Sequence, residues 1–458
     1  MDWNRYDICI IEEQVTISKK EYEELLFLRV LMIHLQEEIR LLKNGKKSGT
    51  SHTPPSHDIG RSNEKSLREK TGKKTGGQKG HKGFTLHMKE IPDEIIDYKP
   101  TECRDCGEKL NEEMAKLIER KQEIIIPPLH AHYVEHRSFT NTCTHCNCVN
   151  TGQLPPNLKA PIQYGANVSA TLTYLFAYQH MPYLRMKILM NDLFKIQLSQ
   201  GTISNILEKM TEQSMPIYNE IQVRIQKSKV VGGDETGTKI NGVKGWFHVW
   251  QNAYLTFIVS ATTRGYKVTE EYFIEGFSKA VYVSDCWSAQ LKTIAKRHQL
   301  CLAHLLRELT NFEEALSCKW STELKILLKQ SIELKQNFQN NDYLHPPPSV
   351  AEIEHKLDEI LLVDYTNFHP KTKAFVKRLI KRRESVFTFL YYKEVPFDNN
   401  GSERAIRNIK VKNKISGCFR SEDGAKQFAV LRSVIDTTIK NTQDVFHAIN
   451  LIAKTQPE

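Results

Sequence analysis

Apolar positions near the amino terminus alternate between spacings of three and four over residues 21–42, EYEELLFLRVLMIHLQEEIRLL. This is the spacing of a heptad repeat, and it predicts a helix with one apolar seam. We interpret residues 15–45 as a coiled-coil helix through which copies of the chain form a homo-oligomer. The alternative is an amphipathic helix packed on its own domain. The seam consists of Leu25, Leu28, Met32, Leu35, Ile39 and Leu42.

A second periodic stretch, residues 156–228, becomes helical from about residue 160. Its sequences YLRMKILMNDLF, KIQLS and QGTISNILEKM predict a helix, a turn and a second helix, with Ser199 or Gln200 near the second cap. Such a pair can place its second helix in the major groove of DNA. Two helices packed in a core would give the same pattern. The sequence therefore predicts a helix-turn-helix-like domain and leaves base contact open.

Short apolar runs with strand-like alternation follow from residue 229. VVGGDET, GWFHVWQ and LTFIVSAT predict three strands, YKVTEEYFIEGF predicts a helix, and KAVYVSDCW predicts a fourth strand. This order predicts an α/β core over residues 229–420. Residues 302–395 are largely helical apart from a break at HPPPS, so we expect a helical insertion at about 310–395. Further helices are predicted for residues 421–458.

Composition places the chain among soluble globular proteins of about three domains, with 458 residues, 40% of them hydrophobic and 26% charged. No apolar run approaches the ~20 residues that span a bilayer, and the amino terminus lacks the pattern of a secretion signal. We therefore expect a cytoplasmic protein without a membrane partner. The net charge of +10 favours a polyanionic partner, with nucleic acid as the leading candidate.

The positive charge is concentrated in part in residues 46–83, a stretch rich in Lys, Gly, Ser, Thr and Pro. From Arg61 to Lys82 it holds eight Lys or Arg against two Glu, which predicts a flexible basic linker. The stretch is either a solvated spacer or an arm that lies along phosphates or in a minor groove. The candidate DNA-binding residues here are Lys73, Lys74, Lys79 and Lys82.

Five of the ten cysteines fall between residues 103 and 148, within a segment that we assign to residues 84–155. Two CxxC pairs separated by 36 residues can close a tetrahedron around a structural Zn²⁺ and fold a segment with little core. A strand, EIIIPPLHAHYVEHRSFT, is predicted between the pairs. His145 and Cys148 are spare ligands, so the fourth ligand stays open, and four unliganded thiols are the alternative. The candidate zinc ligands are Cys103, Cys106, Cys143 and Cys146.

Two acids follow apolar strand sequences: Asp234 after VVGG and Asp285 after VYVS. Ligands of α/β folds gather at the carboxyl ends of strands, and carboxylates are the ligands that Mg²⁺ prefers. Two Mg²⁺ (or Mn²⁺) ions would activate a nucleophile and stabilise a leaving oxygen. Glu403 can supply the third carboxylate, with Asp398 as a second candidate. Taken singly, the three acids could instead be a turn residue, a helix cap and an ion-pair partner of Arg407.

Basic residues surround Glu403 and continue along the helix predicted there. In a segment that borders the acids, they would neutralise the phosphates of bound DNA without reading its sequence. The candidate DNA-binding residues of this segment are Arg404, Arg407, Lys410, Lys412, Lys414 and Arg420.

Four motifs in succession, VVGGDETGT, VYVSDCW, CLAHLLREL and FDNNGSERAIRNIKVKNKISGCFRSEDGA, resemble those of the large transposase of the insertion sequence 66 family. The GGQKGHKG arm, the following CRDCG, and KQEIIIPP before CTHC match the family's order as well. The resemblance covers the chain from about residue 20 to residue 440.

The resemblance implies an α+β multidomain protein with a ribonuclease H-like catalytic core, which cuts element ends and joins them to target DNA in the bacterial cytoplasm. Matched by motif, the catalytic and Mg²⁺-binding triad is Asp234, Asp285 and Glu403. The resemblance also implies double-stranded DNA and small accessory transposition proteins as partners. Two other functions stay open: a non-catalytic DNA-binding regulator derived from a transposase, and a Mg²⁺-dependent nuclease without joining activity.

Cys301 and His304 in CLAH resemble a Cys-x-x-His motif found between the second and third acids of several transposase families. The family has a Trp where Leu302 stands. The resemblance implies that Cys301 packs near the site and that His304 orients a carboxylate or contacts DNA. The alternative is that both are ordinary core and boundary residues of one helical face.

Overall fold

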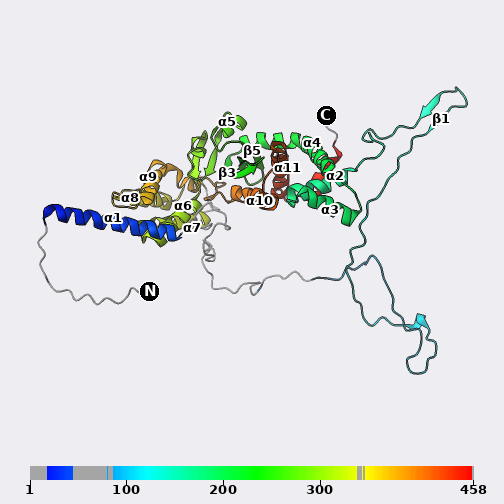
Figure 1. The fold of residues 1–458 in the computed structure, drawn as a ribbon. Helices are drawn as coiled ribbons and strands as arrows, with labels where there is room; N and C mark the ends of the chain where they lie inside the picture. The colour runs from blue at the N-terminus through cyan, green and yellow to red at the C-terminus, as the bar shows by residue number, and fades with distance from the viewer. Residues whose placement is uncertain (1–17, 45–79, 81–85, 338–342, 344–345, 456–458) are drawn as a thin grey trace.

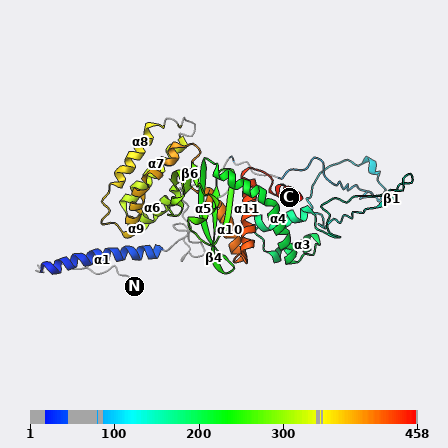
Figure 2. The same cartoon turned by 90° about the horizontal axis from the view of Figure 1, so that it is seen from above.

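The protein is described by a computed structural model that covers residues 18–44, 80, 86–337, 343 and 346–455. Figures 1 and 2 show an elongated arrangement. Helix α1 and a group of helices lie at one end, a β-sheet lies at the centre, and further helices follow. Extended chain reaches out at the other end. No helix of the described part is long and apolar enough to cross a membrane.

The central sheet has the strand order β5-β4-β3-β6-β7. Strands β3, β4 and β5 are antiparallel neighbours, whereas β6 runs parallel to β3, and β7 runs parallel to β6. Asn241 and Gly242 join β3 to β4 in a two-residue hairpin, and both have the positive φ that this tight turn requires. The bounds are β3 Val230–Ile240, β4 Val243–Gln251, β5 Thr256–Ala261, β6 Phe277–Ser284 and β7 Ala295–Leu300.

The predicted order of three strands, a helix and a strand is confirmed, with α5 at Lys267–Tyr272 as the helix. Strand β7, AKRHQL, was not predicted from the sequence. Its first four positions are exposed or half-buried, and only Gln299 and Leu300 are buried, so it lacks an apolar run. A neighbouring strand supplies what the pattern lacks, because β7 pairs with β6 along its length.

Two apolar clusters form the core. The first joins β3, β4 and β5 to the helices that precede and follow the sheet, through residues such as Leu207, Phe257 and Phe428. The second joins β6 and β7 to the helical insertion. Successive residues of β6 alternate between them, with Tyr282 in the first and Val283 in the second, so the clusters lie on opposite faces of this strand. The sheet is therefore held from both sides where the two acids are located.

The helices around the first cluster begin at capping residues that the sequence supplies. Ser199 caps α4 by accepting a hydrogen bond from the Thr202 N–H at 2.9 Å, and Ser421 caps α11 in the same way. The predicted helix, turn and helix before the sheet are confirmed as α3 and α4. The bounds are α2 Ala166–Thr173, the π-helical turn η3 Tyr174–Tyr178, α3 Tyr183–Phe194, α4 Gln200–Gln226, α10 Asn400–Ser416, α11 Glu422–Lys440 and α12 Val445–Lys454.

The described residues of 302–395 are largely helical, as predicted, and pack on β6 and β7 as a group of their own. Pro348 and Pro370 stand in the first turns of α8 and α9, where a missing N–H costs nothing. The bounds are α6 Leu302–Leu316, α7 Lys319–Asn337, α8 Pro348–Leu361 and α9 Pro370–Lys381, with 3-10 turns η4 Gln290–Lys292, η5 Arg383–Ser385 and η6 Thr388–Tyr391.

Helix α1, Lys19–Asn44, confirms the helix predicted at the amino terminus. It contacts α6, yet the described seam residues from Leu25 to Ile39 are all exposed. Side chains on its other faces, such as Phe27 and Ile33, are exposed too. This apolar helix therefore has most of its surface uncovered within one chain.

Residues 86–165 are almost entirely extended and exposed. Their regular elements in the described structure are η2 Glu112–Met114 and the paired strands β1 Thr140–Thr142 and β2 Val149–Thr151. The strand predicted over EIIIPPLHAHYVEHRSFT is wrong up to its last residue, Thr140, where β1 begins. Apolar residues such as Ile125 in this run are exposed, and no neighbouring strand pairs with them, so the run has neither a core nor a ladder to join.

Candidate active site

The two strand acids are brought side by side by the parallel pairing of β3 and β6. The register pairs Gly232 with Val283, so Asp234 and Asp285 stand two residues beyond a matched pair on neighbouring strands. Asp285 follows β6 directly, as expected. Asp234 lies in the middle of β3, because the strand continues to Ile240 beside β4 after its pairing with β6 has ended. Asp234 is therefore at the end of the parallel pairing and not at the end of its strand.

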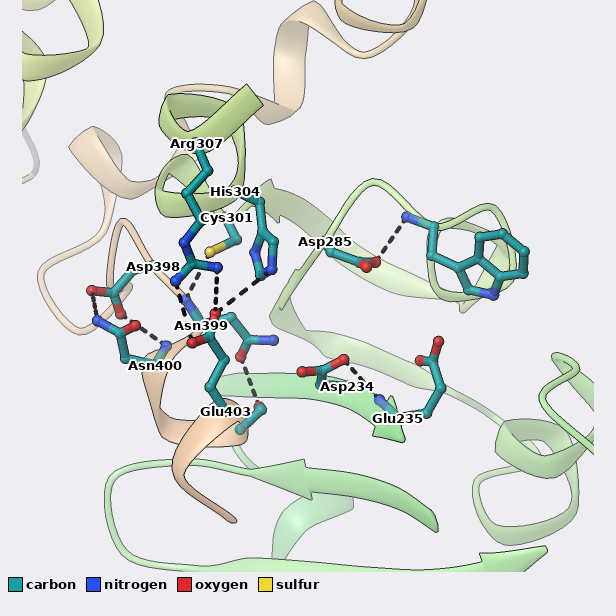
Figure 3. Close-up of polar contacts among 12 residues, drawn as sticks. Asp234, Glu235, Asp285, Cys301, His304, Arg307, Asp398, Asn399, Asn400 and Glu403 are labelled. Atoms are coloured by element: carbon teal, nitrogen blue, oxygen red, sulfur yellow. Dashed lines mark hydrogen bonds and ion pairs between the residues drawn. The ribbon is translucent and has the colours of Figure 1, made fainter. Parts of the chain in front are cut away.

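Glu403 enters the site from the first turn of α10. Asn399, the residue before this helix, fixes that turn to β3: its side-chain amide donates to the Gly233 carbonyl at 2.8 Å. The Asn399 amide oxygen accepts a hydrogen bond from the Ser402 hydroxyl at 2.7 Å, within the same turn of the helix. Asn399 and Ser402 are both buried. The carboxylate of the third acid is thus positioned relative to the first by a buried amide (Figure 3).

Glycines at the contact of α10 with the sheet allow this approach. A Cβ atom on Gly233 would lie 1.8 Å from the Tyr282 hydroxyl, and one on Gly401 would lie 2.5 Å from the side chain of Gln251. A Cβ atom on Gly232 would also lie 2.5 Å from the side chain of Gln251. Larger residues at Gly232 or Gly401 would push α10 away from the sheet, and a larger residue at Gly233 would collide with Tyr282 of β6, so these glycines serve close packing.

Burial and neighbouring charge raise the pKa of Asp234 well above its ordinary value. Burial is the larger cause, and the charges of Asp285, Glu235 and Glu403 add to it. Asp234 also accepts a hydrogen bond from the N–H of Glu235 at 2.8 Å, which acts in the opposite direction. The site therefore concentrates negative charge around a desolvated carboxyl group.

Glu403 is held by two residues of α6. Its two oxygens accept from Arg307 at 3.3 and 3.4 Å, and the His304 Nε2 lies 3.6 Å from one of them. Figure 3 shows the Glu403 carboxylate turned toward Arg307 and His304. Arg307 was not singled out from the sequence, although its spacing of three from His304 places both on one helical face.

Cys301 and Asp398 both have local roles beside the acids. Cys301 is buried before the first turn of α6, and its sulfur accepts from the Asn399 N–H at 3.2 Å. Burial raises the pKa of the Cys301 thiol to about 12, so it packs and does not act as a nucleophile. Asp398 accepts from the N–H and side chain of Asn400 and points away from Asp234 (Figure 3). Asp398 is thus not placed to be the third acid.

A family model described as Transposase IS66 family matches residues 161–427, which is more than half of the chain. The chain belongs to the IS66 family of transposases. The matched region contains all three acids, Asp234, Asp285 and Glu403, together with α6 and the whole sheet. The extended residues 86–160 lie outside it. No curated protein matches the chain.

The candidate DNA-binding residues along α10 and just after it differ in exposure. Arg404, Arg407, Lys414 and Arg420 are exposed, and Lys410 is half-buried. The interpretation of Lys412 as a DNA-binding residue is wrong, because the helical period turns it inward.

Lys412 is only 4% exposed, and its ammonium donates to the carbonyls of His180 and Met181 at 3.3 and 3.2 Å. It also lies 4.3 Å from the ring centroid of Phe176, and burial lowers its pKa to about 8. Lys412 therefore ties α10 to the helical domain. The candidate residues Lys73, Lys74, Lys79 and Lys82 lie outside the described residues.

The four candidate zinc ligands form two similar turns. The Gly107 N–H donates to the Cys103 carbonyl and the Asn147 N–H donates to the Cys143 carbonyl, each at 2.9 Å. Backbone N–H groups at Cys106 and Cys146 are the largest cause of a lowered pKa at Cys103 and Cys143, respectively. Each turn thus favours one thiolate.

These turns are not joined into one site. Among the residues that the structure describes, no group of three or more His, Cys, Asp or Glu side chains could hold a metal ion as it stands. The same holds for the three acids, where the Glu403 carboxylate is engaged by Arg307 and His304.

Proposed function

We propose that this protein is a DNA transposase that cuts the ends of its element and joins them to target DNA with Asp234, Asp285 and Glu403. The observation that supports this most is the convergence of the three acids. Two come from adjacent parallel strands, and the third comes from a helix that Asn399 fastens to the first strand. The strand order around them, with three antiparallel strands followed by two parallel ones, supports a ribonuclease H-like core.

The donor set fits Mg²⁺ or Mn²⁺, since both accept carboxylate oxygens. The charges that raise the pKa of Asp234 are those that a bound divalent cation would offset. We therefore assign Asp234, Asp285 and Glu403 as the ligands of two such ions. Held by these residues, such ions would supply activation of an attacking water or hydroxyl and stabilisation of the leaving oxygen of a phosphodiester.

The protein's own residues prepare this chemistry. Arg307 donates to both oxygens of Glu403 and so limits the rotation of its side chain, and the His304 ring lies against the same carboxylate. Cys301 fixes the backbone at Asn399 and so the start of α10. Exposed Arg404 and Arg407 on that helix would then contact the phosphates of a bound end.

We propose that the grip on DNA extends beyond the catalytic core. The contributors are the remaining basic residues of α10, namely Lys410 and Lys414, with Arg420 after it, the linker lysines, the helix-turn-helix-like domain and the zinc segment. In the zinc segment, we propose that Cys103, Cys106, Cys143 and Cys146 bind one structural Zn²⁺. Assembly through residues 21–42, accessory transposition proteins and action at the nucleoid in the cytoplasm belong to the same proposal.

The test is cleavage and joining of labelled element ends with Mg²⁺ by the wild-type protein and by Glu403→Gln. We expect Glu403→Gln to abolish cleavage and leave end binding within a few-fold, because the amide keeps the shape of the side chain and loses its charge. The matched control is Glu422→Gln, which changes an exposed glutamate in the first turn of α11 and should cleave like wild type.

Each contrary result contradicts a different part of the proposal. Cleavage by Glu403→Gln at the wild-type rate removes Glu403 from the mechanism. Binding without cleavage by the wild-type chain indicates a regulator. Cleavage without a covalent product between donor and target indicates a nuclease.

A further inference from the structure

Beside the first acid lies a second buried carboxylate, Glu235, which the reaction proposed above does not use. Its side chain is 3% exposed. It accepts a hydrogen bond from Arg264 Nε at 2.6 Å and another from the side-chain amide of Gln290. In Figure 3 its carboxylate points away from Glu403. A buried charge with this pairing is committed to its partners, so Glu235 is not a spare metal ligand.

Arg264 connects this carboxylate to two tryptophans. Its guanidinium lies 3.9 Å from the ring centroid of Trp287 and 5.2 Å from that of Trp246. A planar guanidinium can donate along one edge while its face stacks on an aromatic ring, which an ammonium cannot do. Arg264 follows β5, and Trp287 follows β6, so the contact joins segments from two places in the sheet.

Both ends of this set of contacts reach a catalytic acid. The N–H of Glu235 donates to Asp234 Oδ1 at 2.8 Å, and the N–H of Trp287 donates to Asp285 Oδ1 at 2.8 Å. A continuous path therefore runs from Asp234 through Glu235, Arg264 and Trp287 to Asp285.

We propose that Glu235, Arg264 and Trp287 form a brace that holds Asp234 and Asp285 at the separation needed to bind a divalent cation. The inference rests on the proposed function. Two carboxylates on neighbouring strands repel each other, and the loop that carries Asp285 would relax away from Asp234 without a counter-force. The brace provides that force through side chains that act on the two acids by way of the backbone N–H groups of Glu235 and Trp287. These three are positioning residues.

The experiment titrates Mn²⁺ against the full-length protein with two readouts. The first is the Mn²⁺ concentration that raises the melting temperature by a fixed amount; only the part of the rise that is lost in Asp234→Asn is counted, which isolates binding at the acids from binding elsewhere. The second is the Mn²⁺ concentration for half-maximal cleavage of a labelled end. We expect Arg264→Ala to raise both of these Mn²⁺ concentrations about tenfold or more, the effect typical of groups that orient metal ligands. End binding without metal should stay within twofold of wild type.

Lys244→Ala is the matched control. The Lys244 ammonium also lies over Trp246, 5.0 Å from its ring centroid, but Lys244 is not among the partners of Glu235 described above. Both Mn²⁺ concentrations should therefore equal those of wild type. Trp287→Ala removes the stack and leaves the Glu235–Arg264 pair, and Trp287→Phe keeps a ring. We expect Trp287→Ala to raise both Mn²⁺ concentrations and Trp287→Phe to keep them near those of wild type. These two Trp287 variants also test the proposal if Arg264→Ala does not fold.

Mn²⁺ concentrations within twofold of wild type in folded Arg264→Ala or in Trp287→Ala would overturn the proposed brace. A wild-type protein without a metal-dependent melting shift and without cleavage contradicts the proposed function itself. The two failures are therefore distinguishable.

Discussion

The central sheet and the extended residues 86–165 each present a set of residues suited to metal, but they hold those residues in opposite ways. At the sheet, the strand register, a buried amide and close-packed glycines place acids that are 51 to 169 residues apart in the chain. In the extended segment, each CxxC pair is shaped by hydrogen bonds within six residues, and no core surrounds it. The first site depends on tertiary packing, and the second depends on local turns that a metal would have to join.

If this difference is real, substitutions at the sheet should lower the free energy of unfolding of the body, and substitutions in the turns should not. The three changes below run from the largest expected effect on that free energy to the smallest.

Gly233→Ala should have the largest effect. A methyl group there meets the Tyr282 hydroxyl at 1.8 Å, so the Tyr282 ring, β3 or β6 must shift, and overpacking of this kind costs about 3 kcal/mol or more. Cleavage should be lost with it. The measurement is urea unfolding followed by tryptophan fluorescence. Gly237→Ala on the same strand is the control, since its nearest neighbour is 3.6 Å away, and a loss as large as that of Gly233→Ala would refute the packing argument.

Asn399→Ala should cost about 1 to 3 kcal/mol, because it leaves the buried Gly233 carbonyl and Ser402 hydroxyl without their partner. The cleavage rate of the protein that remains folded should also fall, since the Glu403 carboxylate loses its anchor to β3. Asn413→Ala is the matched control: Asn413 accepts from Thr238 at 2.8 Å and ties the far end of the same helix to the same strand. It should lose comparable stability and keep cleavage. Equal cleavage by the two variants would show that Asn399 has no special role.

Cys103→Ser should leave the unfolding of the body unchanged within about 0.5 kcal/mol, since its turn contributes nothing to either apolar cluster. We expect the zinc content of the purified protein to fall from about one ion per chain to near zero, and proteolysis to become faster only within residues 86–165. Metal analysis and limited proteolysis measure both. Cys418→Ser, outside the segment, should keep its zinc. Full zinc content in Cys103→Ser would end the four-cysteine proposal.

Local pattern was enough for much of the fold. Heptad spacing predicted α1, and the turn KIQLS predicted the boundary between α3 and α4. A cap at Ser199 or Gln200 was predicted for the second helix, and Ser199 is the residue that caps α4. The alternating strands and the helical insertion also followed from the pattern. The failures have one cause: β7 is a strand because β6 lies beside it, and EIIIPPLHAHYVEHRSFT is not one because nothing pairs with most of it.

At the site, the acids and His304 were accessible from motif order, while their supporting residues were not. Arg307, Asn399 and Arg264 act through partners that are 96, 166 and 29 residues away. Lys412 shows the converse error, since positive charge in a sequence does not reveal which side of a helix is buried.

The sequence alone determined which side chains are available for chemistry and which stretches favour helix or strand, because those properties are local to residues and their neighbours. Tertiary structure decided which strands carry Asp234 and Asp285 side by side, which lysine is buried, and which arginine pairs with Glu235. Those outcomes depend on strand register and helix packing, which bring together groups that no short stretch of chain contains.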